Sequence, residues 1–192
     1  MKSSKIISQY IEESIICLNK LKLLSNRIEK ISSILIDARE NGKNVFVCGN
    51  GGSGSTASHM YCDFNKTASM LGKKRMKAHS LVDNMPIILA IGNDQSYNDI
   101  FVEQLKNSMK SKDVLIAISG SGNSANVINA AKYAKKIKGI VIGFTGFKGG
   151  KLKSLCDDCI IIPSNSMYRI EDMHLMLNHI LVSVFRNGKD YR

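Results

Sequence analysis

The sequence contains no tryptophan, and its aromatic residues amount to only 6%. It therefore offers few side chains on which nucleic-acid bases stack, although its formal net charge is +11. The lysines are scattered, and only residues 73–77, KKRMK, form a basic cluster. We expect no nucleic-acid partner, because a basic face with interleaved aromatics is missing. The charge favours anionic small molecules as ligands, or simply reflects a lysine-rich proteome.

Long apolar runs are missing as well. No stretch approaches the roughly 18 consecutive apolar residues that a membrane-spanning helix needs. The first 20 residues carry Glu12 and Glu13 inside their apolar pattern, and they lack the small-residue cleavage site of a signal peptide. We therefore expect a cytoplasmic protein without a membrane partner.

The cysteines are odd in number: Cys17, Cys48, Cys62, Cys156 and Cys159. They cannot all pair within one chain, and we expect core or loop thiols of a reducing compartment. Cys156 and Cys159 form a C-x-x-C motif, which could mark a redox or zinc site. No second C-x-x-C completes a zinc cage, and CDDCIIIPS reads as the start of a buried strand, which favours a structural role.

The chain also lacks repeats, low-complexity tracts and linkers, and its prolines, Pro86 and Pro163, sit at apparent element boundaries. Its 192 residues fit a single domain over 1–192 with a core large enough to fold alone. Residues 1–42 predict two helices, because isoleucine and leucine recur there at helical spacing. We expect this N-terminal arm to pack in an oligomer.

From Lys43 onward, short apolar runs alternate with glycine-rich turns and helical patterns. The predicted strands are 45–48, 79–82, 114–118, 140–145 and 160–163, and the predicted helices cover 55–69, 98–110, 124–137 and 168–187. Such alternation predicts an α/β fold with a five-stranded parallel sheet flanked by helices on both faces. Ligands of these sheets bind beyond the carboxyl ends of the strands.

A loop rich in serine and glycine, SGSGNS at 119–124, follows the third predicted strand. Gly120 and Gly122 let the backbone turn sharply and bring its N–H groups close to a ligand. Ser124 is a good N-cap for the next helix, whose free N–H groups and positive dipole end favour a phosphate. Two more serines add hydroxyl donors, so the loop predicts a phosphate site rather than a plain strand-to-helix turn.

A second such loop, GNGGSGS at 49–55, follows the first predicted strand. It lacks the Lys-Ser/Thr end of a P-loop and the dinucleotide-binding fingerprint, and no ribose-binding carboxylate follows the second strand. Nucleotide binding is therefore disfavoured, and a sugar phosphate fits better. Asn50, Ser53 and Ser55 are suited to bond hydroxyl groups along a polyol chain.

Two predicted helices carry side chains that suit a metal and acid–base chemistry. His59 and Asp63 lie four residues apart on one helix face, and Glu171 and His179 lie about 80° apart on the last helix. Two histidines and two carboxylates make a plausible zinc set. An isomerase that moves a carbonyl between C1 and C2 also needs a base, and an acid or metal for the enediol oxygens. From spacing alone, ordinary polar helix faces stay an open alternative.

Taken together, the motifs resemble the phosphoheptose isomerase family. The resemblance covers nearly the whole chain: the two-helix start, CGNGGS at 48–53, His59, AIGND at 90–94, SGSGNS at 119–124, TG at 145–146, GG at 149–150, PS at 163–164 and RIEDMH at 169–174. It implies a SIS (sugar isomerase) fold and a homotetramer with active sites at subunit interfaces. It also implies conversion of sedoheptulose 7-phosphate to D-glycero-D-manno-heptose 7-phosphate through an enediol, in heptose biosynthesis for lipopolysaccharide or capsule.

The resemblance implies roles for particular residues as well. Zinc is expected as the cofactor, bound by His59, Asp63, Glu171 and His179. Catalysis is expected from Asp63 as base and His179 as acid. Substrate binding is expected from Asn50, Gly51, Gly52, Ser53, Asn93, Asp94, Ser119, Gly120, Ser121, Ser124 and Glu171.

Some positions depart from the family pattern. Asp63 stands where the family has the longer Glu, and Glu171 stands where it has Gln. Residues 65–67 lack the usual arginine, and Gly120 replaces a common hydroxyl residue. Because a shift near 1 Å can cost about a hundredfold in rate, a related sugar phosphate as substrate and a non-catalytic SIS scaffold that binds a protein partner stay open as alternatives.

Overall fold

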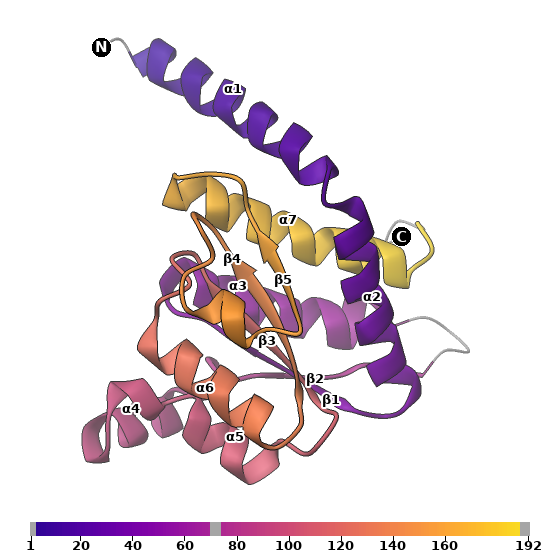
Figure 1. The fold of residues 1–192 in the computed structure, drawn as a ribbon, viewed down its shortest axis with the longest axis vertical. Coiled ribbons are helices and arrows are strands. Elements are labelled where there is room, and N and C mark those ends of the chain that lie inside the picture. The colour runs from indigo at the N-terminus through magenta and orange to yellow at the C-terminus, as the bar shows by residue number, and fades with distance from the viewer. Residues whose placement is uncertain (1–2, 70–73, 189–192) are drawn as a thin grey trace.

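The computed structural model describes residues 3–69 and 74–188, so Lys73 of the basic cluster lies outside the described residues. Its centre is a sheet of five parallel strands in the order β2-β1-β3-β4-β5 (Figure 1). The strands are β1 (Asn44–Cys48), β2 (Lys77–Ser80), β3 (Val114–Ser119), β4 (Ile140–Thr145) and β5 (Asp158–Ile161). Every residue of β3 is buried, as a central strand with both faces covered requires. The predicted α/β fold with a five-stranded parallel sheet is confirmed.

Helices cover both faces of this sheet (Figure 1). One face carries α2 (Ser25–Glu40), α3 (Gly51–Cys62) and α7 (Met167–Phe185), and the other carries α4 (Met85–Asp94), α5 (Val102–Ser108) and α6 (Ala125–Lys136). Successive side chains of a strand point to opposite faces of the sheet, so the sheet separates two hydrophobic cores. Val45 and Val47 of β1 belong to the first core, and Phe46 and Cys48 belong to the second.

The chain begins with two helices, as predicted, because α1 (Ser3–Lys22) precedes α2. Helix α1 projects away from the sheet (Figure 1), and Cys17 and Leu21 are its only buried residues. Its isoleucines are each more than half exposed: Ile6, Ile7, Ile11, Ile15 and Ile16. The apolar face of α1 is therefore uncovered within one chain. Among the described residues, no helix has both the length and the apolar character to cross a membrane.

Several boundaries differ from the sequence-based expectation. Strands β2 and β5 each begin two residues earlier, because pairing with the neighbouring strand extends to Lys77 and Asp158. The helix expected over 55–69 begins at Gly51 and ends in a π-helical turn, η1 (Asp63–Thr67). The helix expected over 98–110 is shorter and follows a separate 3-10 turn, η2 (Tyr97–Asp99).

The apolar pattern does not predict α4, although local signals for it exist. Asn84 caps this helix by accepting a hydrogen bond from Ile87 N at 3.3 Å. Pro86 lies in its first turn, where a missing N–H costs nothing. Most of α4 is exposed, and Ile91 is its only buried residue, so its helical period is weakly marked in the sequence.

The C-x-x-C segment leads into β5, as the sequence indicates. All five cysteines are free thiols. Cys159 is buried in β5, and its sulfur lies 3.6 Å from Thr145 Oγ1 on β4. The metal-ligand group found in the described part of the chain includes neither cysteine of this motif. These contacts support a structural role for the pair.

Candidate active site and metal centre

The candidate site lies at the carboxyl ends of β1 and β3, where the strand order reverses. From β1 the sheet continues to β2 on one side and to β3 on the other. Loops that leave two such strands diverge and open a place for a ligand. Both loops singled out from the sequence, 49–55 and 119–124, start at these two strand ends.

The serine loop after β3 is organised by its own side chains. The Oγ atoms of Ser119 and Ser124 lie 3.1 Å apart, and Ser121 Oγ accepts a hydrogen bond from Asn123 N at 3.1 Å. Ser124 takes the predicted N-cap position of α6, but its side chain makes no capping hydrogen bond. Val127 N donates to Asn126 Oδ1 at 2.9 Å, so the N–H groups of Ala125 and Asn126 are the ones left at the start of α6 for another acceptor, which suits an anion.

Close packing explains two glycines of this loop. Gly122 has φ +67°, and a Cβ on it would overlap Gly149 O. A Cβ on Gly120 would overlap Met167 Sδ at the start of α7. A side chain at position 120 would therefore require Met167 to move, whereas the overlap of Gly122 with backbone fixes the loop against the turn that contains Gly149.

A pair of amides ties the first loop to the start of α6. Asn50 Nδ2 donates to Asn126 Oδ1 at 2.8 Å, and Asn126 Nδ2 donates to Asn50 Oδ1 at 3.0 Å. Tyr97 OH also donates to Asn50 Oδ1 at 3.0 Å. Asn50 and Tyr97 line a cavity of about 400 Å³ beside this loop. Asn50 thus holds the two loops together, while Ser53 is buried in the first turn of α3.

Helices α3 and α7 pack side by side, which brings together residues far apart in the sequence. A Cβ on Gly52 would overlap the Glu171 carboxylate, so this glycine makes room for that side chain. Two turns further along both helices, His59 faces His179, with ring centroids 5.2 Å apart. The two helices therefore run in the same direction. Glu171 and His179 are separated by about 12 Å along α7, at about 1.5 Å per residue.

His59, Asp63 and His179 form a compact cluster, with one ligand atom of each within 4.8 Å of the others. His59 Nε2 lies 3.2 Å from Asp63 Oδ2 and 3.1 Å from His179 Nε2. His179 Nε2 lies 3.8 Å from the same carboxylate oxygen. Two imidazole nitrogens and one carboxylate oxygen are the ligand set of several catalytic zinc sites, which keep a further position open. The three residues fit a divalent metal.

Of the four predicted metal ligands, Glu171 alone does not join this cluster. Glu171 lies against Gly52 instead, so its assignment as a metal ligand stays a prediction that requires its side chain to move. Asn93 and Asp94 lie exposed at the end of α4, where Asn93 Nδ2 donates to Asp94 Oδ1 at 2.8 Å. Neither lines the cavity beside the first loop, and their role in substrate binding also stays a prediction.

Sequence reasoning missed four side chains that the structure places at the site: Asn126, Tyr97, Thr67 and Asn178. Asn178 donates to Asp63 Oδ2 at 2.6 Å, and Thr67 Oγ1 donates to Asp63 Oδ1 at 3.1 Å. The signal for Asn178 was an amide at a core position of the apolar pattern of α7. Asn126 follows the serine loop directly, at a helix start where an amide finds backbone and loop partners.

His174 belongs to the RIEDMH motif but serves the fold rather than the metal cluster. It is fully buried, and its Nε2 lies 3.1 Å from Thr145 O at the end of β4. Burial lowers the pKa of His174 from 6.5 to about 4, because the charged imidazolium is poorly solvated there. A neutral His174 therefore links α7 to the sheet.

Known proteins resemble this chain over most of its length. The SIS domain family model matches residues 9–146. A phosphoheptose isomerase from Aliarcobacter butzleri is 35% identical over 188 residues, which are 97% of this chain and 98% of that protein. One from Clostridium acetobutylicum is 40% identical over 158 residues, 82% of this chain and 80% of that protein.

Solved structures of phosphoheptose isomerases are equally similar in fold. The one from Francisella tularensis gives a TM-score of 0.91 at 29% identity and covers 97% of this chain and 100% of its own. The one from Neisseria gonorrhoeae gives 0.89 at 28% identity and covers 96% of this chain and 98% of its own.

The five-stranded parallel sheet with a serine loop at its switch point is an α/β architecture, and the family match assigns it to the SIS class. The sequence relatives narrow this class, because they match the helices that carry the metal cluster as well as the sheet. The chain belongs to the SIS domain family and, within it, to the phosphoheptose isomerases.

Proposed function

We propose that this protein is an isomerase that converts sedoheptulose 7-phosphate to D-glycero-D-manno-heptose 7-phosphate. One observation supports this more than any other: the serine loop, 119–124, and the cluster of possible metal ligands lie at two points along α7. Ile170 lies beside the loop, because a Cβ on Gly120 would meet Ile170 Cγ2 at 3.6 Å, and from Ile170 to His179 is about 13 Å of helix. This separation suits a substrate that carries its phosphate on C7 and reacts at C1 and C2.

The reaction moves a carbonyl group from C2 to C1. A base removes a proton from C1 while O2 gains a proton, which gives an enediol. O1 then loses its proton while C2 gains one. We assign the base to Asp63 and the acid to His179, because both lie at the cluster and because carboxylate and imidazole side chains commonly serve as general bases and acids.

The remaining residues divide between the metal and the sugar. His59, Asp63 and His179 would hold a divalent metal, which we propose to be zinc, through Nε2, Oδ2 and Nε2. When bound, the zinc would act as a Lewis acid that stabilises negative charge on the substrate oxygens. Ser119, Ser121 and Ser124 would bind the phosphate. Sugar hydroxyls would contact Asn50, Gly51, Gly52, Ser53, Asn93, Asp94, Gly120 and Glu171.

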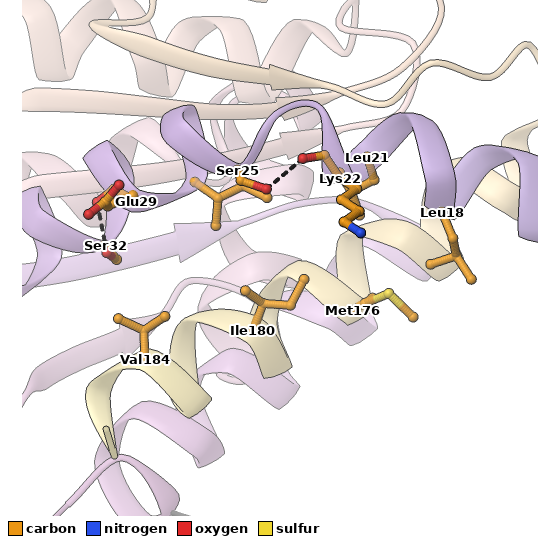
Figure 2. Close-up of a pocket in the computed structure, with 10 residues that line it drawn as sticks. Leu18, Leu21, Lys22, Ser25, Glu29, Ser32, Met176, Ile180 and Val184 are labelled. Carbon is orange, nitrogen blue, oxygen red and sulfur yellow. Dashed lines mark hydrogen bonds between the residues drawn. The ribbon is translucent and has the colours of Figure 1, made fainter. Parts of the chain in front are cut away.

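We further propose a homotetramer with active sites at subunit interfaces. Figure 2 shows an open groove of about 570 Å³ in which Leu18 and Leu21 of α1 face Met176, Ile180 and Val184 of α7. Met176 and Ile180 also line a second hollow that His179 shares. A partner helix seated on these side chains would therefore cover His179 as well.

The proposed setting is cytoplasmic heptose biosynthesis that supplies lipopolysaccharide or capsule. The substrate is anionic because of its phosphate, and a chain with a formal net charge of +11 attracts anions over long range at low salt.

Metal analysis combined with turnover of sedoheptulose 7-phosphate tests the proposal. We expect about one zinc per chain in the wild type, and the His59→Ala and His179→Ala variants should each lose zinc and turnover. His79→Ala is a matched control, because this histidine stacks on Phe46 away from the cluster. A wild type that binds no zinc, together with full activity in His179→Ala, would contradict the proposal.

A further inference from the structure

The carboxylate of Asp63 is held on both of its oxygens. Thr67 Oγ1 donates to Oδ1 at 3.1 Å, and Asn178 Nδ2 donates to Oδ2 at 2.6 Å. Oδ2 is also the oxygen that lies 3.2 Å from His59 Nε2 and 3.8 Å from His179 Nε2. Two hydrogen bonds from different helices therefore fix the rotation of this carboxylate and decide which oxygen faces the histidines.

Asn178 is an unusual residue at its position in α7. It is fully buried, and its Oδ1 has no hydrogen-bond partner. A buried polar atom without a partner is costly, and an apolar side chain of similar volume would avoid that cost. The amide cannot turn over to relieve it, because Oδ1 would then face the Asp63 carboxylate. The side chain of Asn178 makes one hydrogen bond, to Asp63. We therefore attribute to this bond the advantage that offsets the cost of the unpaired Oδ1.

Thr67 reaches Asp63 through an irregular turn. The helix changes from α to π at Asp63, and Ala68 N donates to Asp63 O at 2.7 Å across five residues. Turns of this kind occur preferentially at functional sites. Arg186 Nη1 donates to Thr67 O at 2.9 Å, which ties the turn to the end of α7. Both donors to Asp63 thus lie where α7 packs against the π turn.

We infer that Asn178 and Thr67 are positioning residues, which hold the Asp63 carboxylate so that Oδ2 completes the metal site with His59 and His179. The inference rests on the proposed function, because it assigns Asp63 to that metal site. Both donors are neutral, so they orient the carboxylate without cancelling its charge. Groups that orient a ligand in this way typically change metal affinity or activity by roughly 10- to 100-fold.

The first test replaces Asn178 with a leucine of similar volume and measures zinc affinity by chelator competition. We expect Asn178→Leu to bind zinc roughly 10- to 100-fold more weakly and to lose kcat more than it raises KM. The metal-free Tm should stay near that of the wild type or rise, since the substitution also removes the unpaired Oδ1. A lower metal-free Tm with unchanged zinc affinity would mean a purely structural role and would overturn the inference.

Thr67 offers a matched pair of variants. Thr67→Val removes the hydroxyl at constant shape, and Thr67→Ser keeps it. We expect weaker zinc binding in the valine variant and near-wild-type binding in the serine variant. Equal zinc affinity in the wild type, Asn178→Leu and Thr67→Val would overturn the inference and leave the proposed function intact. A wild type that binds no zinc would overturn both.

Discussion

At the scale of single residues, the hydroxyl of Ser124 has two alternative roles: it can cap α6, or it can bond to groups in the serine loop and to an anion. It could cap α6, but it lies 3.1 Å from Ser119 Oγ and makes no capping bond. We propose that this hydroxyl bonds an anion at the helix start, together with backbone N–H groups.

We therefore expect Ser121→Ala combined with Ser124→Ala to weaken sugar-phosphate binding by about 1–3 kcal/mol, at about 0.5–1.5 kcal/mol for each neutral hydrogen bond. Isothermal titration calorimetry measures the effect. Ser33→Ala, on the exposed side of α2, is the control and should bind as the wild type does. An unchanged affinity in the double variant would remove this loop from the site.

His174 gives stability a specific dependence on pH. Its pKa is about 4 in the folded chain against 6.5 ordinarily, so the unfolded chain binds the extra proton between these values. The contribution of neutral His174 is complete above pH 6.5 and is lost as the pH falls toward 4. Between pH 6.5 and 4, each unit by which the pH falls should therefore lower the free energy of unfolding by up to about 1.4 kcal/mol.

Urea unfolding of the wild type and His174→Gln at several pH values between 4 and 7 checks this prediction. Glutamine keeps a donor for Thr145 O but does not titrate. The difference in stability between the two proteins should therefore shrink or reverse on acidification. A difference that stays constant with pH would exclude His174 as its source.

The sequence pointed to His59, Asp63 and His179 because ligand-type residues recurred at helical spacing on two helices. Their meeting depends on α3 and α7 lying side by side, which a periodic pattern in one helix does not contain. Asn178 was missed for the converse reason, since it occupies a core position where the pattern indicates apolar packing. Glu171 was expected at the metal but lies against Gly52, a contact set by helix packing rather than by spacing.

At the scale of elements, the serine loop depends on a glycine at position 122. Ala here would face φ +67° and would overlap Gly149 O. The positive φ costs a residue with a Cβ roughly 1–2 kcal/mol, and the overlap with backbone adds to it. Gly122→Ala should therefore lower the Tm and weaken phosphate binding.

Gly92→Ala is the matched control for this loop. Gly92 lies in α4, where a Cβ would meet only Ile100 Cγ2 at 3.9 Å, an ordinary contact. Alanine favours a helix interior over glycine by about 0.5–1 kcal/mol, so this variant should keep or gain stability. Equal effects of the two substitutions, measured by thermal unfolding and phosphate titration, would mean that the loop tolerates a side chain.

Strands were predicted well because the central ones are continuous apolar runs, such as β3 with every residue buried. Helix α4 was missed because its exposed surface includes Met85 and Leu89, which blurs the amphipathic pattern. The π turn at Asp63–Thr67 was missed as well; it packs against α7, a contact that the local sequence pattern does not contain.

At the scale of the whole molecule, the apolar face of α1 is uncovered within one chain, and the proposed homotetramer would cover it. We expect light scattering at micromolar concentration to give four times the chain mass of 21.2 kDa. Ile7→Glu combined with Ile11→Glu should dissociate the assembly and leave the circular dichroism spectrum of the sheet and helices unchanged. Lys5→Glu, a charge change elsewhere on α1, should stay tetrameric. A monomeric wild type would contradict the proposed assembly.

The central claim is that metal-dependent proton transfer at C1 and C2 takes place on a substrate held by its phosphate. Its most direct test is NMR of sedoheptulose 7-phosphate incubated with the zinc-loaded protein in D2O. We predict formation of the heptose 7-phosphate with deuterium at C2, no conversion after removal of the metal by a chelator, and none with His179→Ala. Neither product nor deuterium exchange from the zinc-loaded wild type would contradict the account.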